Sequence, residues 1–324
     1  MKPSSSGRGA YVPPHRRGEA SRTSRPQKLE EDPDVDALCN TFSRVYCINL
    51  ASRVDKWNMI QKRALNVGES FARKLERFDA IDGTNKQDDD DIVVRWDCTQ
   101  NAKYSRRITS PGIRSMTHGE IGCALSHISI WRQLGEDPTI GGEDCSVLIL
   151  EDDAIFATYR GQSRFAKAFA TTMKKIPDHW DILYLGFSSR GERQYVNASP
   201  VSTTVHTKNK DILPRSVRWE DPLDPEIKLY RPTYGFHTHA YAITKRAAKT
   251  LVQHHIPIQG PIDVWLADNQ WFQLAVYCAV IANEGWNLGQ GNFEGEPLII
   301  QDRGRRSRSD IEQSAEMEQN GHGR

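Results

Sequence analysis

Long hydrophobic runs are absent from this sequence of 324 residues, and so is a signal-type N-terminus. The longest apolar run, residues 274–282, is far shorter than the about 17–25 residues with which a helix crosses a membrane. The first 30 residues contain no apolar core of a secretory signal. We therefore expect no transmembrane segment, and we predict a cytoplasmic location.

A strong net charge and a cysteine framework are absent as well. The 43 Lys and Arg residues balance 42 Asp and Glu residues, which argues against a wholly basic nucleic-acid binder and against an acidic solvating protein. The six cysteines never form a Cys-x-x-Cys pair, and the sequence contains no His-Glu-x-x-His motif. We therefore expect reduced thiols rather than disulfides, and we do not expect a zinc enzyme.

The two ends of the chain differ in composition from its middle. Residues 1–36 are rich in Ser, Gly, Pro and Arg, which predicts a disordered basic arm. Within it, residues 9–17 resemble a short segment near the N-termini of some DEAD-box RNA helicases. Weak partner binding through the arm and chance similarity both remain open. Residues 303–324 lack apolar periodicity and predict a second disordered tail. One folded domain is expected over residues 40–302.

Apolar patterns in the middle of the chain alternate between strand and helix type. A helix is predicted after Ser52 as its cap, with Gly68 as its stop. Its apolar face is predicted to hold Val54, Trp57, Ile60, Ala64 and Leu65. A second helix follows the Thr117–Glu120 capping-box pattern, and a third follows Thr244. The segments 84–115 and 187–228 show no convincing element. Strands are expected at residues 44–50, 78–83, 146–150, 181–186, 239–243, 277–282 and 298–300. This alternation predicts an α/β sandwich.

Three adjacent carboxylates, Glu151, Asp152 and Asp153, follow the apolar run 147–150 directly. In open α/β sheets, ligands bind beyond the carboxyl ends of the strands. Carboxylates packed this closely disfavour each other's ionisation, and Mg²⁺ or Mn²⁺ relieves the repulsion while bridging to substrate phosphates. The triplet therefore indicates a metal–diphosphate site. A solvated acidic turn, or an Asp capping the next helix, is the alternative.

A set of short motifs in a fixed order resembles glycosyltransferase family 25. This family contains bacterial lipooligosaccharide sugar transferases and the collagen hydroxylysine galactosyltransferases. The motifs are YCINLASRVDK at 46–56, FDAIDG at 78–83, THGEIGCALSH at 117–127, LEDD at 150–153, WDILYLG at 180–186, HAYAIT at 239–244, PID at 261–263 and PLIIQ at 297–301. Each motif alone is weak, but their ordered occurrence across about residues 44–301 is specific.

The resemblance implies a GT-A type fold, which is a Rossmann-like sandwich with a mostly parallel central sheet. It also implies inverting transfer of a sugar, expected to be a hexose, from a nucleotide diphosphate donor such as a UDP-sugar. The acceptor would be a glycan or glycoprotein hydroxyl. An acidic motif in the family holds a divalent metal, so Glu151, Asp152 and Asp153 are implied ligands of Mn²⁺ or Mg²⁺. The first position here is Glu rather than Asp, which lengthens the reach of the carboxylate.

Further site residues are expected from their positions relative to these motifs. His239 is a candidate metal ligand because imidazole is acceptable to Mn²⁺, with an ordinary strand position as the alternative. Asp263 is the candidate catalytic base, and its alternative role is to orient a helix. Asp181 is a weaker candidate for the base.

Residues after the first strand are expected to bind the donor nucleotide in such a fold. They are Asn49, Leu50, Arg53 and Asp55, together with Asp152. Arg53 suits a phosphate because guanidinium offers paired donors. A cap and salt bridge at the start of the helix is the alternative for Asp55. A non-catalytic cytosolic scaffold that keeps the same fold is the alternative for the whole chain.

Overall fold

The computed structural model describes residues 32–98, 112–159, 162–187, 195–197, 226–232, 237–267, 273–282 and 295–302. All of them belong to one unit of the chain, residues 31–324. Of the two predicted tails, 1–36 and 303–324, all but residues 32–36 lie outside the described residues. Among the described residues, no helix is both long enough and apolar enough to span a bilayer.

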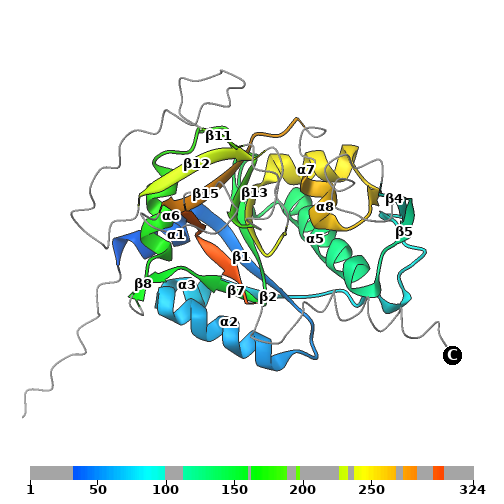
Figure 1. The fold of residues 1–324 in the computed structure, drawn as a ribbon. Helices are drawn as coiled ribbons and strands as arrows, with labels where there is room; N and C mark the ends of the chain where they lie inside the picture. Colours follow the sequence, from blue (N-terminus) through cyan, green and yellow to red (C-terminus); the bar gives the residue numbers. More distant parts are fainter. Residues whose placement is uncertain are drawn as a thin grey trace, which may run out of the picture. The chain divides into compact units, whose positions relative to one another are not determined.

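A central sheet of nine strands forms the middle layer of the described part. Its strands are β1 (Phe42–Asn49), β2 (Leu75–Asp79), β6 (Ser146–Glu151), β10 (Ile182–Gly186), β11 (Tyr195–Asn197), β12 (Ile227–Pro232), β13 (Ala240–Thr244), β15 (Val276–Ala282) and β16 (Gly295–Pro297). Their order is β11-β12-β15-β10-β13-β6-β1-β2, and β16 pairs with β15 (Figure 1). Strands β12, β13 and β16 run antiparallel to the other six strands. The mostly parallel α/β sheet predicted from the sequence is confirmed, and it is Rossmann-like.

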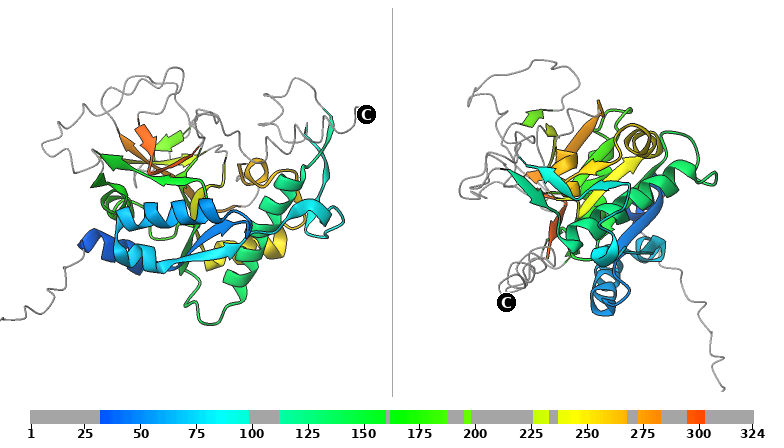
Figure 2. Two further views of the ribbon diagram at one scale, coloured as in Figure 1. Left: turned by 90° about the horizontal axis from the view of Figure 1, so that it is seen from below. Right: turned by 90° about the vertical axis from the view of Figure 1, so that its right-hand side faces the viewer.

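Helices cover both faces of this sheet. One layer holds α1 (Pro33–Thr41), α2 (Val54–Val67), α3 (Glu69–Lys74) and α6 (Phe165–Met173), and the other holds α5 (His118–Glu136), α7 (Lys245–His254) and α8 (Ile262–Ala267). Alternate side chains of β1 enter the two cores, because successive side chains of a strand point to opposite faces. Val45 and Cys47 pack under α1–α3 and α6, while Tyr46 and Ile48 pack under α5. Figures 1 and 2 show α2 and α5 on opposite sides of the sheet.

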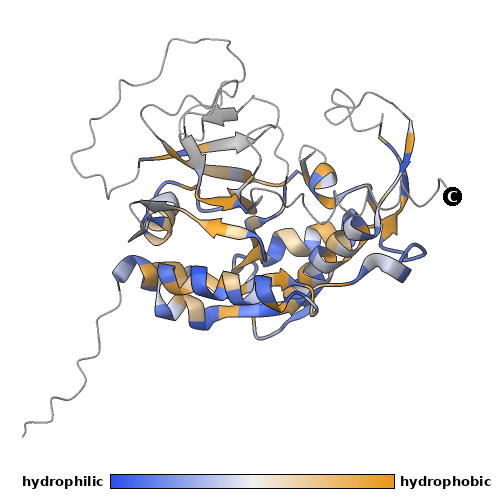
Figure 3. Cartoon of the chain, turned by 60° about the horizontal axis from the view of Figure 1, so that its bottom comes forward, coloured by the Kyte–Doolittle hydropathy of each residue, from blue (hydrophilic) through white to orange (hydrophobic). Residues whose placement is uncertain are grey.

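Burial explains why the central strands read as continuous apolar runs. Residues 147–150 of β6 are fully buried, because helices cover both faces of the strand. The central strands are accordingly hydrophobic in Figure 3, whereas the helices carry a polar side.

The start signals read from the sequence are confirmed for two helices. At α5, the Thr117 hydroxyl accepts a hydrogen bond from the Glu120 backbone N–H at 3.2 Å, and the Glu120 carboxylate accepts one from the Thr117 N–H at 2.8 Å. At α7, the Thr244 hydroxyl accepts a hydrogen bond from the Ala247 N–H at 3.2 Å. Caps of this kind contribute about 1 kcal/mol each.

The first helical segments differ from the prediction. Helix α1 begins at Pro33, capped by Asp32, so residues 33–36 belong to the folded unit rather than to the arm. Burial of Val35 and Leu38 against the sheet makes this short helix stable. Helix α2 has Arg53 rather than Ser52 at its cap position, and no side chain caps it.

Two apolar residues of α2 are also placed differently from the prediction. Val54 is 55% exposed and Leu65 is 56% exposed. The buried stripe of the helix follows Ile60, Ala64 and Val67, with Trp57 at its margin. The helical spacing of apolar residues defines the buried face only approximately. The prediction therefore included two residues at its margin that do not pack against the sheet.

Segments predicted as loops contain short strands. Within 84–115 lie β3 (Ile92–Val93), β4 (Arg95–Asp97) and β5 (Ile113–Ser115), and β3 pairs with β14 (Ile258–Gln259). Strand β12 begins inside the segment 187–228. The remainder of that segment, apart from β11, Phe187 and Glu226, lies outside the described residues. Two-residue and three-residue strands are too short to show a period in a sequence, so tertiary pairing decides them.

Candidate active site

The candidate site lies at one edge of the sheet, where the ends of four strands meet and three of them carry polar residues. Strands β1, β6 and β10 end there with Asn49, Glu151 and Gly186, and β13 begins there after His239 because it runs in the opposite direction. The Glu151 N–H donates to the His239 carbonyl at 2.9 Å, which ties the two strands together at this edge.

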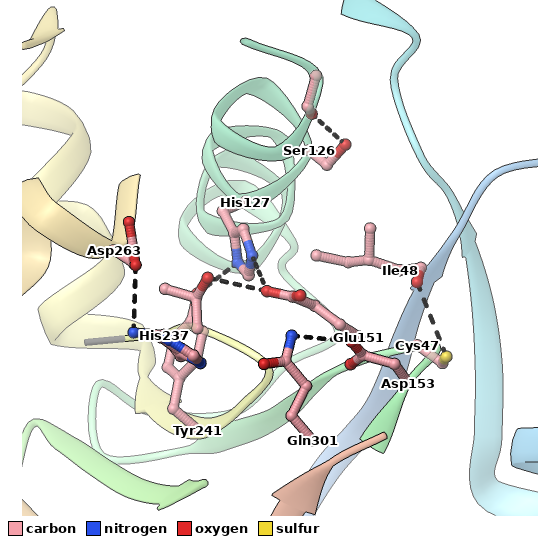
Figure 4. A network of polar contacts seen from close by, with 12 residues as sticks. Cys47, Ile48, Ser126, His127, Glu151, Asp153, His237, Tyr241, Asp263 and Gln301 are labelled. Atoms are coloured by element: carbon pink, nitrogen blue, oxygen red, sulfur yellow. Dashed lines mark hydrogen bonds and ion pairs between the residues drawn. The ribbon is translucent and has the colours of Figure 1, made fainter. Parts of the chain in front are cut away.

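The three adjacent carboxylates turn to three different partners. Asp152 accepts a 2.7 Å hydrogen bond from the Asn49 amide of β1, and Asp153 accepts a 2.8 Å hydrogen bond from Gln301. Glu151 accepts from the Thr238 hydroxyl at 2.8 Å and faces His127 of α5. Figure 4 shows Glu151 toward His127 while Asp153 lies beside Gln301. The triplet therefore forms a row of separately held groups rather than a single acidic cluster.

The pKa of Asp153 is strongly raised. Burial raises its pKa to about 7, and the charge of Glu151 adds to the rise, whereas the hydrogen bond from Gln301 opposes it. Its Oδ1 atom is buried and has no hydrogen-bond partner. Burial also raises the pKa of Asp152, and the hydrogen bond from Asn49 opposes that rise.

These features suit a divalent cation. A buried carboxylate oxygen without a hydrogen-bond donor is costly unless a positive charge compensates it. Carboxylate oxygens are the ligands that Mg²⁺ and Mn²⁺ prefer. Asp153 through Oδ1, with Asp152 next to it, would hold such an ion, and the donor set fits.

Glu151 belongs to a second group of residues on the α5 side. His127 is fully buried, its Nε2 lies 3.5 Å from Glu151 Oε1, and its Nδ1 lies 2.8 Å from the Tyr241 hydroxyl. Burial alone would raise the pKa of Glu151, but the neighbouring His127 holds it below its ordinary value. The ligand-type atoms of Cys123, His127 and Glu151 all lie within 4.8 Å of one another.

Asp263 is held at the start of α8. Its Oδ1 accepts a 2.8 Å hydrogen bond from the Val264 N–H, and its Oδ2 accepts a 3.4 Å hydrogen bond from the His237 N–H (Figure 4). Burial raises its pKa, and the charge of His237 acts against that rise. The charge of Asp263 also raises the pKa of Cys123, after burial and Glu151, so these groups act on one another electrostatically.

The structure restricts how His239 can take part. Its ring is buried, and Nε2 lies 3.3 Å from the Ile299 carbonyl oxygen, which can only accept. Nε2 therefore carries the proton, and ligation of a metal would fall to Nδ1. The ring packs so closely on Gly186 that a Cβ there would lie 2.3 Å from Nε2.

Asp181 is not a candidate base, contrary to one prediction. It precedes β10 and therefore lies at the opposite edge of the sheet. Its carboxylate accepts hydrogen bonds from Arg246 at 3.0 Å and from the Ala275 N–H at 2.8 Å. Its role is to join α7 to the chain before β15.

The predicted donor-binding residues form the connection from β1 to α2. The Arg53 N–H donates to the Leu50 carbonyl at 2.9 Å, and the Asn49 amide donates to the Arg53 carbonyl at 3.1 Å. Asn49 is buried and engaged with Asp152 as well, whereas Asp55 is exposed. Lys56, which sequence reasoning missed, is close enough to oppose the burial-driven rise in the pKa of Asp152 and of Asp153.

Comparison with known proteins assigns this arrangement to a family. The family model described as Glycosyltransferase family 25 (LPS biosynthesis protein) matches residues 42–266, which is well over half of the sequence. The chain belongs to glycosyltransferase family 25. The resemblance read from the ordered motifs is thereby confirmed.

Several curated relatives are similar to this member of family 25. A Procollagen lysyl hydroxylase and glycosyltransferase of Acanthamoeba polyphaga mimivirus is 33% identical over 44% of the chain, and a Glycosyltransferase 25 family member of Anopheles gambiae is 25% identical over 70%. A Procollagen galactosyltransferase 2 of Mus musculus is 27% identical over 45%. The matches span only 15%, 31% and 21% of those relatives' own lengths.

The site also contains residues that sequence reasoning did not single out. Thr238 and Gln301 hold Glu151 and Asp153, and Cys123 lies one helical turn before His127. Gln301 lies 35 residues beyond the end of the family match at 266. The sequence signal for three of these residues was their place in the family motifs: Cys123 and His127 lie in one motif and Gln301 lies in another. The motifs did not indicate which carboxylate each residue would contact.

Proposed function

We propose that this family 25 protein is a metal-dependent, inverting glycosyltransferase of the GT-A type. It transfers a sugar, a hexose, from a nucleotide diphosphate donor, a UDP-sugar, to a hydroxyl of a glycan or glycoprotein. Family membership and the names of relatives described as galactosyltransferases support the transferase reaction. The mixed sheet with polar residues at the carboxyl ends of β1 and β6 supports a nucleotide site at that edge.

The observation that carries the metal dependence is the state of Asp153. Its Oδ1 is buried without a hydrogen bond, and its pKa stands at about 7 because burial and Glu151 disfavour the charged form. Mn²⁺ or Mg²⁺ held by Asp153 and Asp152 would remove that cost. When bound, the cation supplies positive charge that stabilises the departing diphosphate. Of the other two predicted ligands, His239 would coordinate through Nδ1, and Glu151 is turned toward His127.

Donor binding is supported by positive charge at the start of α2. Arg53 occupies the cap position of this helix, and Lys56 lies in its first turn. The N-terminus of a helix and paired guanidinium donors both favour phosphate groups. The proposed diphosphate position is thus between these cations and the Asp152–Asp153 edge.

Asp263 is the proposed base for a single displacement. The acceptor hydroxyl oxygen attacks the anomeric carbon, the bond from that carbon to the diphosphate oxygen breaks, and the hydroxyl proton passes to the Asp263 carboxylate. Attack opposite the leaving group inverts the configuration. A raised pKa suits this role, because a carboxylate that is too acidic is a weak base at neutral pH.

The test is Mn²⁺-dependent release of the nucleoside diphosphate from a panel of UDP-, GDP- and CDP-sugars. Asp153→Asn is expected to lower turnover about 100-fold or more while the chain stays folded, because a charge-stabilising contribution of several kcal/mol is lost. Asp178→Asn is the matched control, because Asp178 is exposed and precedes β10 at the opposite edge of the sheet. Full turnover in Asp153→Asn contradicts the metal role. No release from any sugar nucleotide by the unaltered chain contradicts the enzyme, and favours the scaffold alternative.

A further inference from the structure

We propose that Cys123, His127 and Glu151 form a second cation site, specific for a borderline-soft transition metal of the Zn²⁺ class. The ligands are the Cys123 Sγ, the His127 Nε2 and a Glu151 carboxylate oxygen. This site is separate from the proposed Mn²⁺ or Mg²⁺ position at Asp152 and Asp153, and it does not depend on sugar transfer.

The two elements that carry the ligands meet at the edge of the sheet. Cys123 and His127 are four residues apart on α5, so both project from the same face of the helix. Glu151 ends β6, which packs directly beneath that face. The three ligand-type atoms lie within 4.8 Å of one another without any rearrangement of the backbone.

The separation between His127 and Glu151 suits two ligands of one cation. Nε2 and Oε1 are 3.5 Å apart, which is beyond the usual range of about 2.7–3.2 Å for an N–H···O hydrogen bond. Zn–N and Zn–O bonds of about 2.0–2.2 Å at a tetrahedral angle place the two ligand atoms roughly 3.4 Å apart. The observed gap therefore suits a bridging metal better than a direct hydrogen bond.

An independent observation is the state of the His127 ring. The side chain is completely buried, and its Nε2, which faces Glu151, has no hydrogen-bond partner. A buried ring nitrogen in this state is expected to have a ligand.

The other ring nitrogen is engaged in the way that metal-binding histidines require. Nδ1 lies 2.8 Å from the Tyr241 hydroxyl, and the Trp131 Nε1–H donates to the same hydroxyl at 2.9 Å (Figure 4 shows His127 beside Tyr241). If Nδ1–H donates to Tyr241, the Nε2 lone pair is left for a cation. Such an outer hydrogen bond fixes the tautomer and orientation of a ligating imidazole.

The donor set distinguishes this site from the carboxylate site. One thiolate, one imidazole and one carboxylate favour Zn²⁺ over Mg²⁺, which prefers oxygen ligands only. Three protein ligands would leave a fourth position for water, and the Thr238 hydroxyl donates a 2.8 Å hydrogen bond to Glu151 Oε1. Occupation would tie α5 to β6 and would compensate the charge of Glu151 separately from that of Asp153.

The experiment uses the full chain, stripped with EDTA and titrated with Co²⁺. Wild type is expected to bind Co²⁺ with a thiolate-to-metal absorption band in the near ultraviolet, and Zn²⁺ is expected to displace it. Cys123→Ser is expected to abolish the band, and His127→Asn to weaken Co²⁺ binding strongly. Tyr241→Phe, which removes only the outer hydroxyl, is expected to weaken Co²⁺ binding about 10–100-fold.

Two matched variants serve as controls. Cys145→Ser removes another partly buried thiol, at the opposite end of β6, and is expected to keep the band. Asp153→Asn is expected to keep it as well, because that side chain belongs to the other site. Absence of the band in wild type, or its persistence in Cys123→Ser, overturns the proposal.

A second measurement does not depend on the folding of any variant. In wild type, Zn²⁺ is expected to slow the reaction of Cys123 with N-ethylmaleimide about tenfold or more, if occupation follows ordinary mass action. The reaction at Cys145 is expected not to change, and peptide mass spectrometry reads both residues in one sample. Equal rates at Cys123 with and without Zn²⁺ contradict the site.

Discussion

Gln301 donates a 2.8 Å hydrogen bond to the Asp153 carboxylate across 148 positions of the sequence. The partner strands β17 (Ile299–Gln301) and β7 (Ala154–Phe156) bring the two together, because they pair antiparallel directly after the acidic triplet. The Asp302 N–H adds a 2.8 Å hydrogen bond to the Asp153 carbonyl, and Arg63 of α2 forms an ion pair with Asp302. A strand from the end of the described chain thus orients the carboxylate whose other oxygen is left without a donor.

Replacing Gln301 by Leu is expected to weaken Mn²⁺ binding about tenfold. A hydrogen bond to a charged group contributes about 1.5–3 kcal/mol, and only part of that is lost if Asp153 reorients. Mn²⁺ affinity, measured by the electron paramagnetic resonance signal of the free ion, checks this without relying on activity. Ile300→Ala, on the same strand and 44% exposed, is the control and should leave the affinity unchanged. Equal affinities in Gln301→Leu and wild type would remove Gln301 from the site.

Replacing Asp263 by Asn is expected to lower kcat about 100-fold or more with little change in KM for the donor, because a general base acts only in the transition state. The pH dependence follows from its pKa, which burial raises above the ordinary value of 3.8. Only the ionised carboxylate accepts the proton, so the rate of wild type should fall on acidification at a higher pH than an ordinary Asp would give. The Asn variant should lose this acid limb. A kcat within twofold of wild type rules Asp263 out as the base.

Replacing Lys56 by Gln is expected to raise KM for a nucleotide diphosphate donor about fivefold, or ~1 kcal/mol, since Lys56 is partly exposed and its charge is screened. The defect should shrink at high salt for the same reason. Lys62→Gln is the control, because Lys62 is exposed further along the same helix. If both variants bind the donor equally well, the positive charge at the start of α2 does not contact it.

Replacing Gly122 by Ala is expected to destabilise the chain by roughly 1–3 kcal/mol. An added Cβ would lie 2.3 Å from the Ile81 carbonyl oxygen and 3.0 Å from the Gly83 nitrogen, and both are backbone atoms that cannot rotate away. Urea unfolding is the measurement. Gly135→Ala is the control on the same helix, because its Cβ would meet the flexible Lys249 side chain at 3.2 Å and the Lys249 Cα at an ordinary 4.0 Å. Ala also favours helix by up to about 1 kcal/mol. Equal stability of both variants would show that α5 shifts freely against the turn at Gly83.

The local rules were sufficient for the framework of the fold. The capping box at Thr117 and Glu120 is satisfied within one turn of helix, so its signal lies in four consecutive residues. The apolar run before Glu151 indicated a strand buried on both faces, and helices do cover both faces of β6. Because the acidic triplet follows this run directly, the sequence also predicted that the triplet lies at the carboxyl end of a sheet strand. The structure places it there.

The partners of the acidic triplet were decided by tertiary structure alone. Adjacent residues at the end of a strand point in different directions, so Glu151 meets His127 of α5, Asp152 meets Asn49 of β1, and Asp153 meets a strand far along the sequence. Periodicity cannot show which of several elements packs against a given side chain, because packing depends on the relative placement of whole layers. The amino-acid sequence therefore determined that carboxylates end the central strand, whereas the fold decided which partner each of them meets.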